Sequence, residues 1–176
     1  MNVPYYTIQL PEVPRALEQE PWPRLVTRGS PLWERKHVER FAYYVRREGH
    51  FDFLQFETSD TEDYRAYLFA NRPNQFPRVL VGACCFRFRE YKNADSRWGL
   101  QWVWLHPYSR GRGILSAAWD GFHATFGNFL PEPPYSRAME SFLRKRGLCV
   151  YCWQPLDSDA VYCSKCEALY FGRQTR

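Results

Sequence analysis

The sequence has 176 residues, enough for one ordinary domain and a small appendage, and its 45% hydrophobic content can form a sizeable core. No apolar run is long enough to cross a bilayer, and residues 1–10 lack the basic and apolar regions of a signal peptide, so we expect a cytoplasmic protein without membrane contact. The net charge of +5 is compatible with an anionic small molecule, nucleic acid or acidic proteins, and it does not choose among them.

The N-terminal segment, residues 1–29, contains five prolines, which break any long helix or strand. Short extended pieces are expected at residues 5–10 and 24–27. We expect this segment to wrap the following domain, and a surface binding arm is the alternative that a proline-rich composition also allows.

The first helix is predicted from Pro31 to Gly49, with the Ser30 hydroxyl as its N-cap and proline in the first helical position. Apolar residues at helical spacing predict its buried side: Val38, Phe41, Ala42 and Val45. Its basic residues are interpreted mainly as a solvated face, with a binding patch as the alternative: Arg35, Lys36, Arg40, Arg46 and Arg47.

Three strands are predicted next, at residues 51–56, 64–70 and 79–88, with an acidic loop at 57–63 between the first two. A polar loop at residues 89–97 is then expected to lead into the central strand.

Two adjacent cysteines, Cys84 and Cys85, lie in the third predicted strand. Adjacent strand residues face opposite sides of a sheet, so these two cannot bind one metal ion together. We interpret both as small core residues.

The most informative stretch runs from residue 100 to residue 126. Residues 100–105 form a largely apolar run typical of a buried strand, and Pro107 ends it because proline cannot donate to the ladder. The chain then turns at Arg110, Gly111, Arg112 and Gly113, and a helix follows that buries Leu115, Ala118, Phe122 and Phe126. The unpaired N–H groups at such a helix start, with two arginines beside them, predict an anion site suited to phosphate.

A short strand at residues 129–130 and a last helix are predicted after this stretch. Ser136 is expected to cap that helix, and Gly147 to end it.

The C-terminal segment carries two Cys-x-x-Cys pairs, Cys149 with Cys152 and Cys163 with Cys166. This spacing predicts a tetrahedral Zn²⁺ site that is structural, because protein fills all four ligand positions. Two disulfides are the alternative, which the expected reducing compartment disfavours. We therefore expect two domains, residues 1–147 and a zinc ribbon at 148–176. Because the ribbon's charge is balanced, a protein partner is favoured over nucleic acid.

The strand, the Arg-Gly-Arg-Gly turn and the helix together resemble the central motif of the GCN5-related N-acetyltransferases, although Tyr108 stands where that family usually has glutamine or arginine. The resemblance implies an α+β (mixed α/β) fold, with a mostly antiparallel central sheet flanked by helices. It also implies that acetyl-coenzyme A is held by the strand and the turn, through Val103, Trp104, Leu105, Arg110, Gly111, Arg112, Gly113, Ile114 and Leu115.

Within that superfamily the chain is similar to the sister-chromatid cohesion acetyltransferases. The shared features are Trp104 in the central strand and the proline-rich acidic stretch 131–134, where Glu132 matches a residue that takes part in catalysis in that family. Two features differ: the zinc module of that family precedes the catalytic domain, and its phosphate turn is not glycine-paired. We carry over no cohesin substrate.

The chemistry implied is acetyl transfer from acetyl-coenzyme A to an amine of a protein or small molecule. An ammonium acceptor must lose a proton, and the candidate bases are Glu132, Glu57, Asp60, Glu62 and His106, of which Glu132 is preferred. The family's usual tyrosine acid is replaced by Leu143, so Tyr135 and Ser136 are the candidate proton donors to the departing thiolate. That missing tyrosine favours the alternative function, a non-catalytic adaptor that binds protein or nucleic acid through the zinc ribbon.

Overall fold

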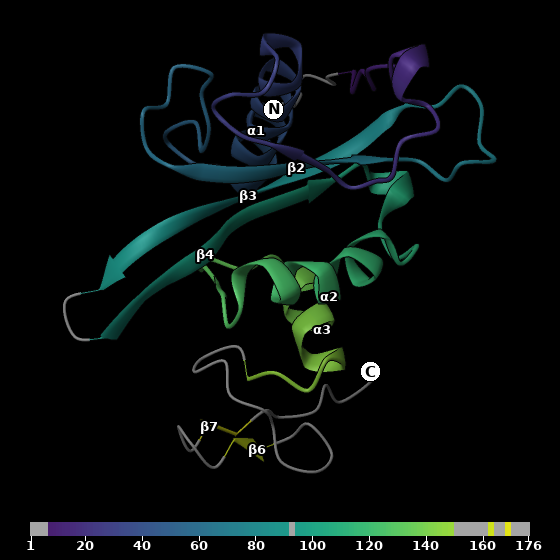
Figure 1. Cartoon of the computed structure of the whole chain (residues 1–176). Coiled ribbons are helices and arrows are strands. Elements are labelled where there is room, and N and C mark those ends of the chain that lie inside the picture. Colours follow the sequence, from purple (N-terminus) through teal and green to yellow (C-terminus); the bar gives the residue numbers. More distant parts are fainter. Residues whose placement is uncertain (1–6, 92–93, 150–161, 164–167, 170–176) are drawn as a thin grey trace, which may run out of the picture. The chain divides into compact units, whose positions relative to one another are not determined.

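A five-stranded sheet forms the centre of the first unit of the chain, residues 1–132, in the order β1-β2-β3-β4-β5. The computed structural model describes residues 7–91, 94–149, 162–163 and 168–169. Four strands form an antiparallel ladder and the fifth pairs in parallel with β4: β1 (Arg24–Val26), β2 (Tyr64–Ala70), β3 (Leu80–Tyr91), β4 (Ala94–Leu105) and β5 (Leu130–Pro131). The predicted mixed α/β class with a mostly antiparallel sheet is confirmed (Figure 1).

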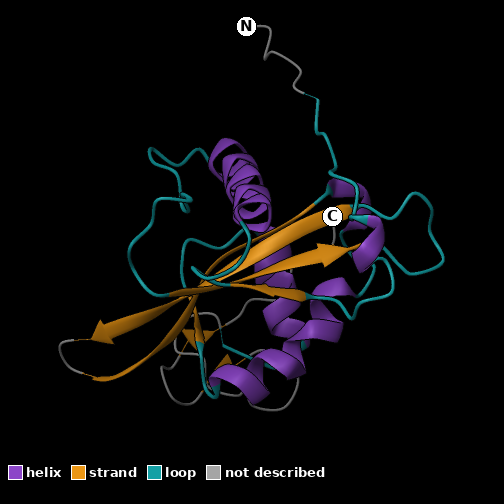
Figure 2. Cartoon of the chain, turned by 45° about the horizontal axis from the view of Figure 1, so that its top comes forward, coloured by secondary structure: helices purple, strands orange, loops and turns teal. Residues whose placement is uncertain are grey.

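Two helices cover the two faces of this sheet, α1 (Leu32–Gly49) on one side and α2 (Ile114–Phe126) on the other (Figures 1 and 2). Two short 3-10 helices, η1 (Arg15–Leu17) and η2 (Pro107–Ser109), lie in the connecting segments. Among the helices that the structure describes, none combines the length and the apolarity that a membrane crossing requires.

The predicted buried stripe of α1 is confirmed, since Val38, Phe41, Ala42 and Val45 are all buried. The predicted N-cap is wrong by one residue, because the carbonyl of Pro31 accepts the first helical bond, from the N–H of Glu34 at 3.1 Å. The Ser30 hydroxyl instead accepts from the N–H of Thr27 at 3.0 Å, so it closes the turn before the helix.

Two tryptophans of β4 carry the packing between the sheet and α1. Trp104 stacks on Phe41 of α1, with ring centroids 5.4 Å apart, and Trp102 belongs to the same buried cluster. Cys85 of β3 also lies in this cluster, so it is a core residue as predicted. Burying large aromatic surfaces on both elements is what holds α1 against the sheet.

The α2 side of the sheet has its own aromatic core, centred on Phe86 of β3. Phe86 stacks on Phe126 at 4.3 Å and meets Phe122 edge-on at 5.0 Å. Leu115 and Ala118 are also buried, so the predicted inner face of α2 is confirmed.

The strand predicted at residues 51–56 is absent, and the segment is a loop. β2 already has β1 on one edge and β3 on the other, so neither edge remains for another strand. The apolar alternation has a different cause: Phe56 is fully buried edge-on against Tyr64 at 4.8 Å, whereas Phe53 is 67% exposed. Of the extended piece predicted at residues 5–10, the described part, residues 7–10, is likewise not a strand.

The polar loop predicted at residues 89–97 is also wrong for its described residues, because β3 runs to Tyr91 and β4 begins at Ala94, and the paired strands extend beyond α1 and α2 (Figure 2). Phe88 pairs with Trp98 across this ribbon, with their rings 5.7 Å apart. Such cross-strand pairs support a two-stranded ribbon without a continuous apolar face, so the pattern that identifies buried strands is missing there.

The second unit, residues 133–176, contains α3 (Arg137–Lys145) and a two-stranded ladder of β6 (Tyr162–Cys163) and β7 (Ala168–Leu169). Ser136 caps α3 as predicted, since its hydroxyl accepts from the N–H of Met139 at 3.2 Å. The predicted domain boundary at residues 147 and 148 lies inside this unit and stays a prediction.

A matched pair of glycine substitutions tests how closely β3 and β4 approach. A methyl group on Gly82 would lie 2.2 Å from the carbonyl oxygen of Trp104, whereas one on Gly121, in the middle of α2, meets nothing within 4 Å. We expect Gly82→Ala to lower the free energy of unfolding by about 1–3 kcal/mol, and Gly121→Ala to raise it by about 0.5–1 kcal/mol. Urea unfolding of both variants measures this, and equal stabilities would contradict the close approach.

Candidate functional site

The edge of β4 that faces β5 has no strand partner over most of the C-terminal half of β4. β5 pairs with β4 only at Gly99 and Leu100, and the N–H of Glu132 adds one bond, to the carbonyl of Leu100 at 2.9 Å. From Gln101 to Leu105, no strand in the described part of the chain pairs with this edge, although β3 pairs with the other edge as far as Leu105. Backbone donors and acceptors that lack a strand partner can pair with an extended ligand.

A β-bulge lies where β5 leaves β4. Phe86 pairs with Leu100 and the neighbouring Cys85 with Trp102, so Gln101 is an additional residue on β4. Such a bulge bends a strand and increases its twist, which accounts for the separation of β4 from β5 at this point.

The turn after β4 has the geometry that the sequence predicts. Gly111 and Gly113 have φ of +70° and +82°, in the left-handed region, and Gly113 is the N-cap of α2. A methyl group at either glycine meets nothing within 4 Å, so glycine is required here for its backbone angle rather than for internal space. The N–H groups of Ile114 and Leu115, in the first turn of α2, have no acceptor within the helix and can therefore bind an anion.

The two arginines of the turn have different environments. Arg110 is held by the protein: its Nε donates to the carbonyl of Leu105 at 2.8 Å, and its Nη2 lies 2.6 Å from the carboxylate of Glu48. Its guanidinium also lies over the ring of Trp104, at 5.8 Å. Both arginines are exposed, but Arg112 has no hydrogen bond or ion pair within the described residues, so it is the arginine of the turn that is available to a ligand.

Glu132 is fixed at the point where β5 leaves β4. It accepts two hydrogen bonds from Arg89, one from Nε at 2.7 Å and one from Nη2 at 3.0 Å. A methyl group on Gly99 would lie 2.1 Å from Glu132 Oε1, so the carboxylate occupies the space that a side chain at position 99 would fill. A two-pronged pair of this kind defines the direction of the carboxylate as well as its position.

A second polar cluster surrounds the bulge and is centred on Arg87, which is only 5% exposed. Its guanidinium bonds the Gln101 side chain at 2.9 Å and two carboxylates of the acidic loop, Asp60 at 2.5 Å and Glu62 at 3.2 Å. Gln101 in turn donates to the Gln55 side chain at 3.0 Å. Because a buried arginine requires acidic partners, two of the candidate bases are already engaged with it.

Burial changes the titration of three groups near β4. It lowers the pKa of His106, with the positive charge of Arg110 acting in the same direction and Glu48 opposing it, so the neutral imidazole that a base requires is favoured. Burial also raises the pKa of Cys85 to about 12 and that of Cys84 well above its ordinary value. Both cysteines are therefore protonated and unreactive at neutral pH, as predicted for core residues.

The predicted coenzyme residues in β4 alternate between the two faces of the sheet. Trp104 is buried on the α1 face, whereas Val103 and Leu105 are half-buried and alternate with it. Of the predicted proton donors, Ser136 is exposed and Tyr135 half-buried. Both belong to the second unit, so their meeting with Glu132 stays a prediction.

The predicted zinc ligands fall mostly outside the described residues. Cys149 is described and buried, and Cys163 lies in β6, whereas Cys152 and Cys166 lie outside the described residues. Among the residues that are described, no group of three or more histidine, cysteine, aspartate or glutamate side chains gathers to hold a metal ion. The zinc site therefore remains a prediction.

Sequence reasoning missed three residues that build the site: Arg89, Gly99 and Gln101. The sequence does contain a signal for the arginines. Arg87 and Arg89 occupy the alternate positions that face inward in a strand that is otherwise apolar. A charge in such a position predicts an acidic partner. Gly99 and Gln101 give no comparable signal, because their roles depend on how β3 and β5 align with β4.

No family model and no curated protein sequence matches this chain. Among solved structures, the chain is similar to the xEco2 acetyltransferase domain, with 14% identity and a TM-score of 0.48 over 78% of this chain and 91% of that one. It is also similar to a ribosomal-protein-alanine N-acetyltransferase from Brucella melitensis biovar Abortus 2308, with 14% identity and a TM-score of 0.48 over 76% and 96% of the two chains. A tetramutant of the BH1408 protein from Bacillus halodurans has 12% identity and a TM-score of 0.47 over 76% and 99%.

Proposed function

We propose that the chain is an N-acetyltransferase of the GCN5-related type, which moves an acetyl group from acetyl-coenzyme A to an amine of a protein or small molecule. The observation that carries the proposal is the open edge of β4, which begins at the bulge and leads to the glycine turn and the start of α2. An extended ligand with peptide-like amides, followed by a doubly charged anionic group, matches this order of groups. The pantetheine arm and pyrophosphate of coenzyme A have that chemistry.

The proposed binding mode assigns distinct roles to the strand and the turn. The amides of the pantetheine arm would pair with the backbone of β4 between Val103 and Leu105. The pyrophosphate would accept from the N–H groups of the turn and of Ile114 and Leu115, with Arg112 as the charged contact.

The affinity for acetyl-coenzyme A tests this mode and separates the two arginines. We expect Arg112→Ala to weaken binding at least about tenfold without loss of stability, since a charge-assisted bond is removed from an exposed side chain. Arg110→Ala, in contrast, is expected to lower the stability of the protein in addition to its affinity, because Arg110 joins the turn to Glu48 and Leu105. Calorimetry and thermal unfolding measure both, with Arg72→Ala on the exposed loop after β2 as the charge-matched control.

A native protein that does not bind acetyl-coenzyme A would end the acetyltransferase proposal. Replacement of Gly113 by valine provides a second check, because its φ of +82° is strained for any branched side chain. We expect this variant to lose most of its affinity for the coenzyme.

In the proposed reaction, the amine nitrogen bonds to the acetyl carbon as the bond from that carbon to sulfur breaks. Glu132 takes the proton that the amine loses, and Tyr135 or Ser136 donates one to the departing thiolate. Arg89 acts as a positioning residue, since it holds both carboxylate oxygens of Glu132. Because Arg89 already bonds both oxygens, the acceptor amine must approach the Glu132 carboxylate from a side that the Arg89 guanidinium leaves free.

Turnover tests the role of Glu132. We expect Glu132→Gln to slow coenzyme A release by roughly 10²–10⁴-fold at neutral pH, the usual contribution of a positioned base. The loss should shrink as pH rises, because the amine then deprotonates without help. Chromatographic detection of coenzyme A, with a panel of lysine peptides and polyamines as acceptors, measures the effect.

Asp60→Asn and Glu62→Gln are the matched controls, since both carboxylates already pair with Arg87. Arg89→Met should give a smaller loss than Glu132→Gln and shift the pH profile, because the carboxylate remains but is no longer held. Native turnover in Glu132→Gln would exclude Glu132 as the base and favour His106 or the acidic loop.

We further propose that the four C-terminal cysteines, Cys149, Cys152, Cys163 and Cys166, bind one structural Zn²⁺ in a reducing cytoplasm, and that the ribbon they form contacts a protein partner. Their spacing supports this, and four thiolates complete a tetrahedral shell. Elemental analysis after gel filtration should find one zinc per chain. Chelation should release it and unfold the ribbon, because metal supplies most of the folding energy of so small a unit. Two disulfides by mass spectrometry, without zinc, would refute this assignment.

A further inference from the structure

A basic stripe runs along the outer face of α1. It consists of Lys36, Arg40, Tyr43 and Arg47, which follow one another at helical intervals of four, three and four residues, and all four are exposed. At the rise of an α-helix the stripe is about 17 Å long, and the exposed His50 follows it as the C-cap of α1. A tyrosine that is 54% exposed lies in the middle of its positive charges.

Two of the three glutamates of α1 pair with arginines outside the stripe, and the third, Glu39, is half-buried and accepts from a neutral backbone N–H, which does not cancel its charge. The pairs are Glu34 with Arg24 at 2.6 Å, Glu39 with the N–H of Thr58 at 2.9 Å, and Glu48 with Arg110 at 2.6 Å. The stripe, with Lys36, Arg40 and Arg47, therefore carries more positive than negative charge, and a chain of negative charges is a suitable partner for it.

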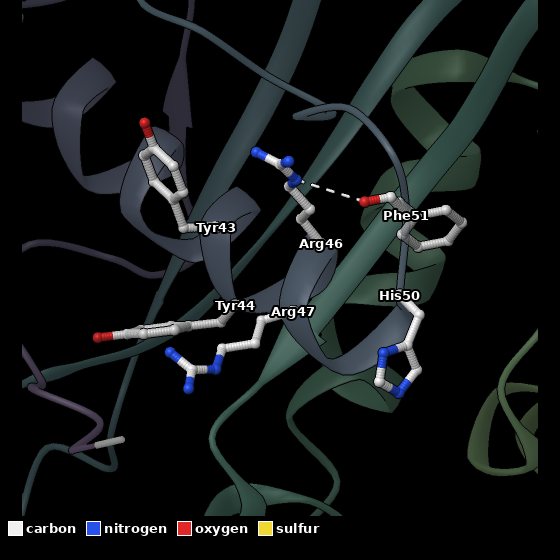
Figure 3. Close-up of a pocket in the computed structure, with 6 residues that line it drawn as sticks. All are labelled: Tyr43, Tyr44, Arg46, Arg47, His50 and Phe51. Carbon is white, nitrogen blue, oxygen red and sulfur yellow. Dashed lines mark hydrogen bonds between the residues drawn. The ribbon is translucent and has the colours of Figure 1, made fainter. Parts of the chain in front are cut away.

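A hollow of about 490 Å³ lies at the C-terminal end of the stripe (Figure 3). Aromatic and basic side chains line it: Tyr43, Tyr44, Arg46, Arg47, His50 and Phe51. Its volume is in the range of sites that hold one small organic group, such as a nucleotide.

The walls of this hollow are held by the rest of the first unit. Tyr44 packs against Trp104 with ring centroids 4.9 Å apart, and Arg46 donates to the carbonyl of Phe51 at 3.3 Å, the bond drawn in Figure 3. A preformed aromatic wall beside cations is the combination that holds an unstacked base and its phosphate.

We propose that α1 binds single-stranded nucleic acid, with phosphates along Lys36, Arg40 and Arg47 and a base in the hollow against Tyr43. Two features favour this ligand over an acidic peptide or a duplex. A carboxylate side chain has no flat face to stack on tyrosine, and the bases of a duplex are stacked on one another and cannot enter a hollow. This proposal is independent of acetyl transfer, because none of its residues belongs to the proposed coenzyme site.

Fluorescence anisotropy with a labelled 12-nucleotide oligoribonucleotide tests the proposal, on the full chain and without acetyl-coenzyme A. We expect binding that weakens with salt. The double variant Lys36→Ala, Arg40→Ala should lower the slope of log affinity against log salt by about 1.4, roughly 0.7 for each phosphate that is no longer neutralised. Tyr43→Ala should weaken binding at least about fivefold, the lower limit for one stacked base, whereas Tyr43→Phe should retain it.

The matched control is the double variant Arg15→Ala, Arg72→Ala, which removes the same charge from exposed positions outside α1. It should leave the affinity and the salt slope close to those of the native chain. An equal loss in the control, or no binding by the native chain, would overturn the proposal. Equally tight binding of the matching duplex would also overturn it, as would competition by polyglutamate as strong as that by the unlabelled oligonucleotide, which would indicate an acidic protein partner.

Discussion

The unequal pairing of the two edges of β4 is the constraint on which the rest of the site depends. One edge is bonded to β3 as far as Leu105, so the strand is held in place, and the other is bonded to β5 only at Gly99 and Leu100. A strand that was open on both edges would not hold a fixed position, and one paired on both edges could not receive a ligand. With the bulge at Gln101, β4 stays bonded to β3 on one edge while its other edge is left without a strand partner.

Charged side chains stabilise the region where the ladder is interrupted. Arg87 and Arg89 lie two positions apart on β3 and engage carboxylates from distant parts of the chain, Asp60 in the acidic loop and Glu132 after β5. The position of the polar groups beside the bulge therefore depends on ion pairs rather than on apolar packing. Because these pairs are partly shielded from water, removing one partner leaves the other charge poorly compensated.

The parts of the fold that follow a periodic pattern were predictable from the sequence. The inner faces of α1 and α2 repeat the helical interval, β2 and residues 100–105 of β4 are apolar runs, and the turn is marked by its glycines. The segment 51–56 and the β3–β4 hairpin were mispredicted, because their state depends on which strand edges are free and on cross-strand pairs. Arg89, Gly99 and Glu132 could not be grouped from the sequence, since only the alignment of three strands brings them together.

The contact of Glu132 with Arg89 and Gly99 also makes the intervening chain a closed loop. Everything from Gln101 to Pro131, including the turn and α2, is joined at its two ends by this contact and by the short β4–β5 ladder. The entropy of closing such a loop is lost once, when the ends meet, and is regained only when they part. While the ends stay joined, the turn and α2 regain little chain entropy by leaving the sheet, and leaving it would also expose the aromatic core around Phe86.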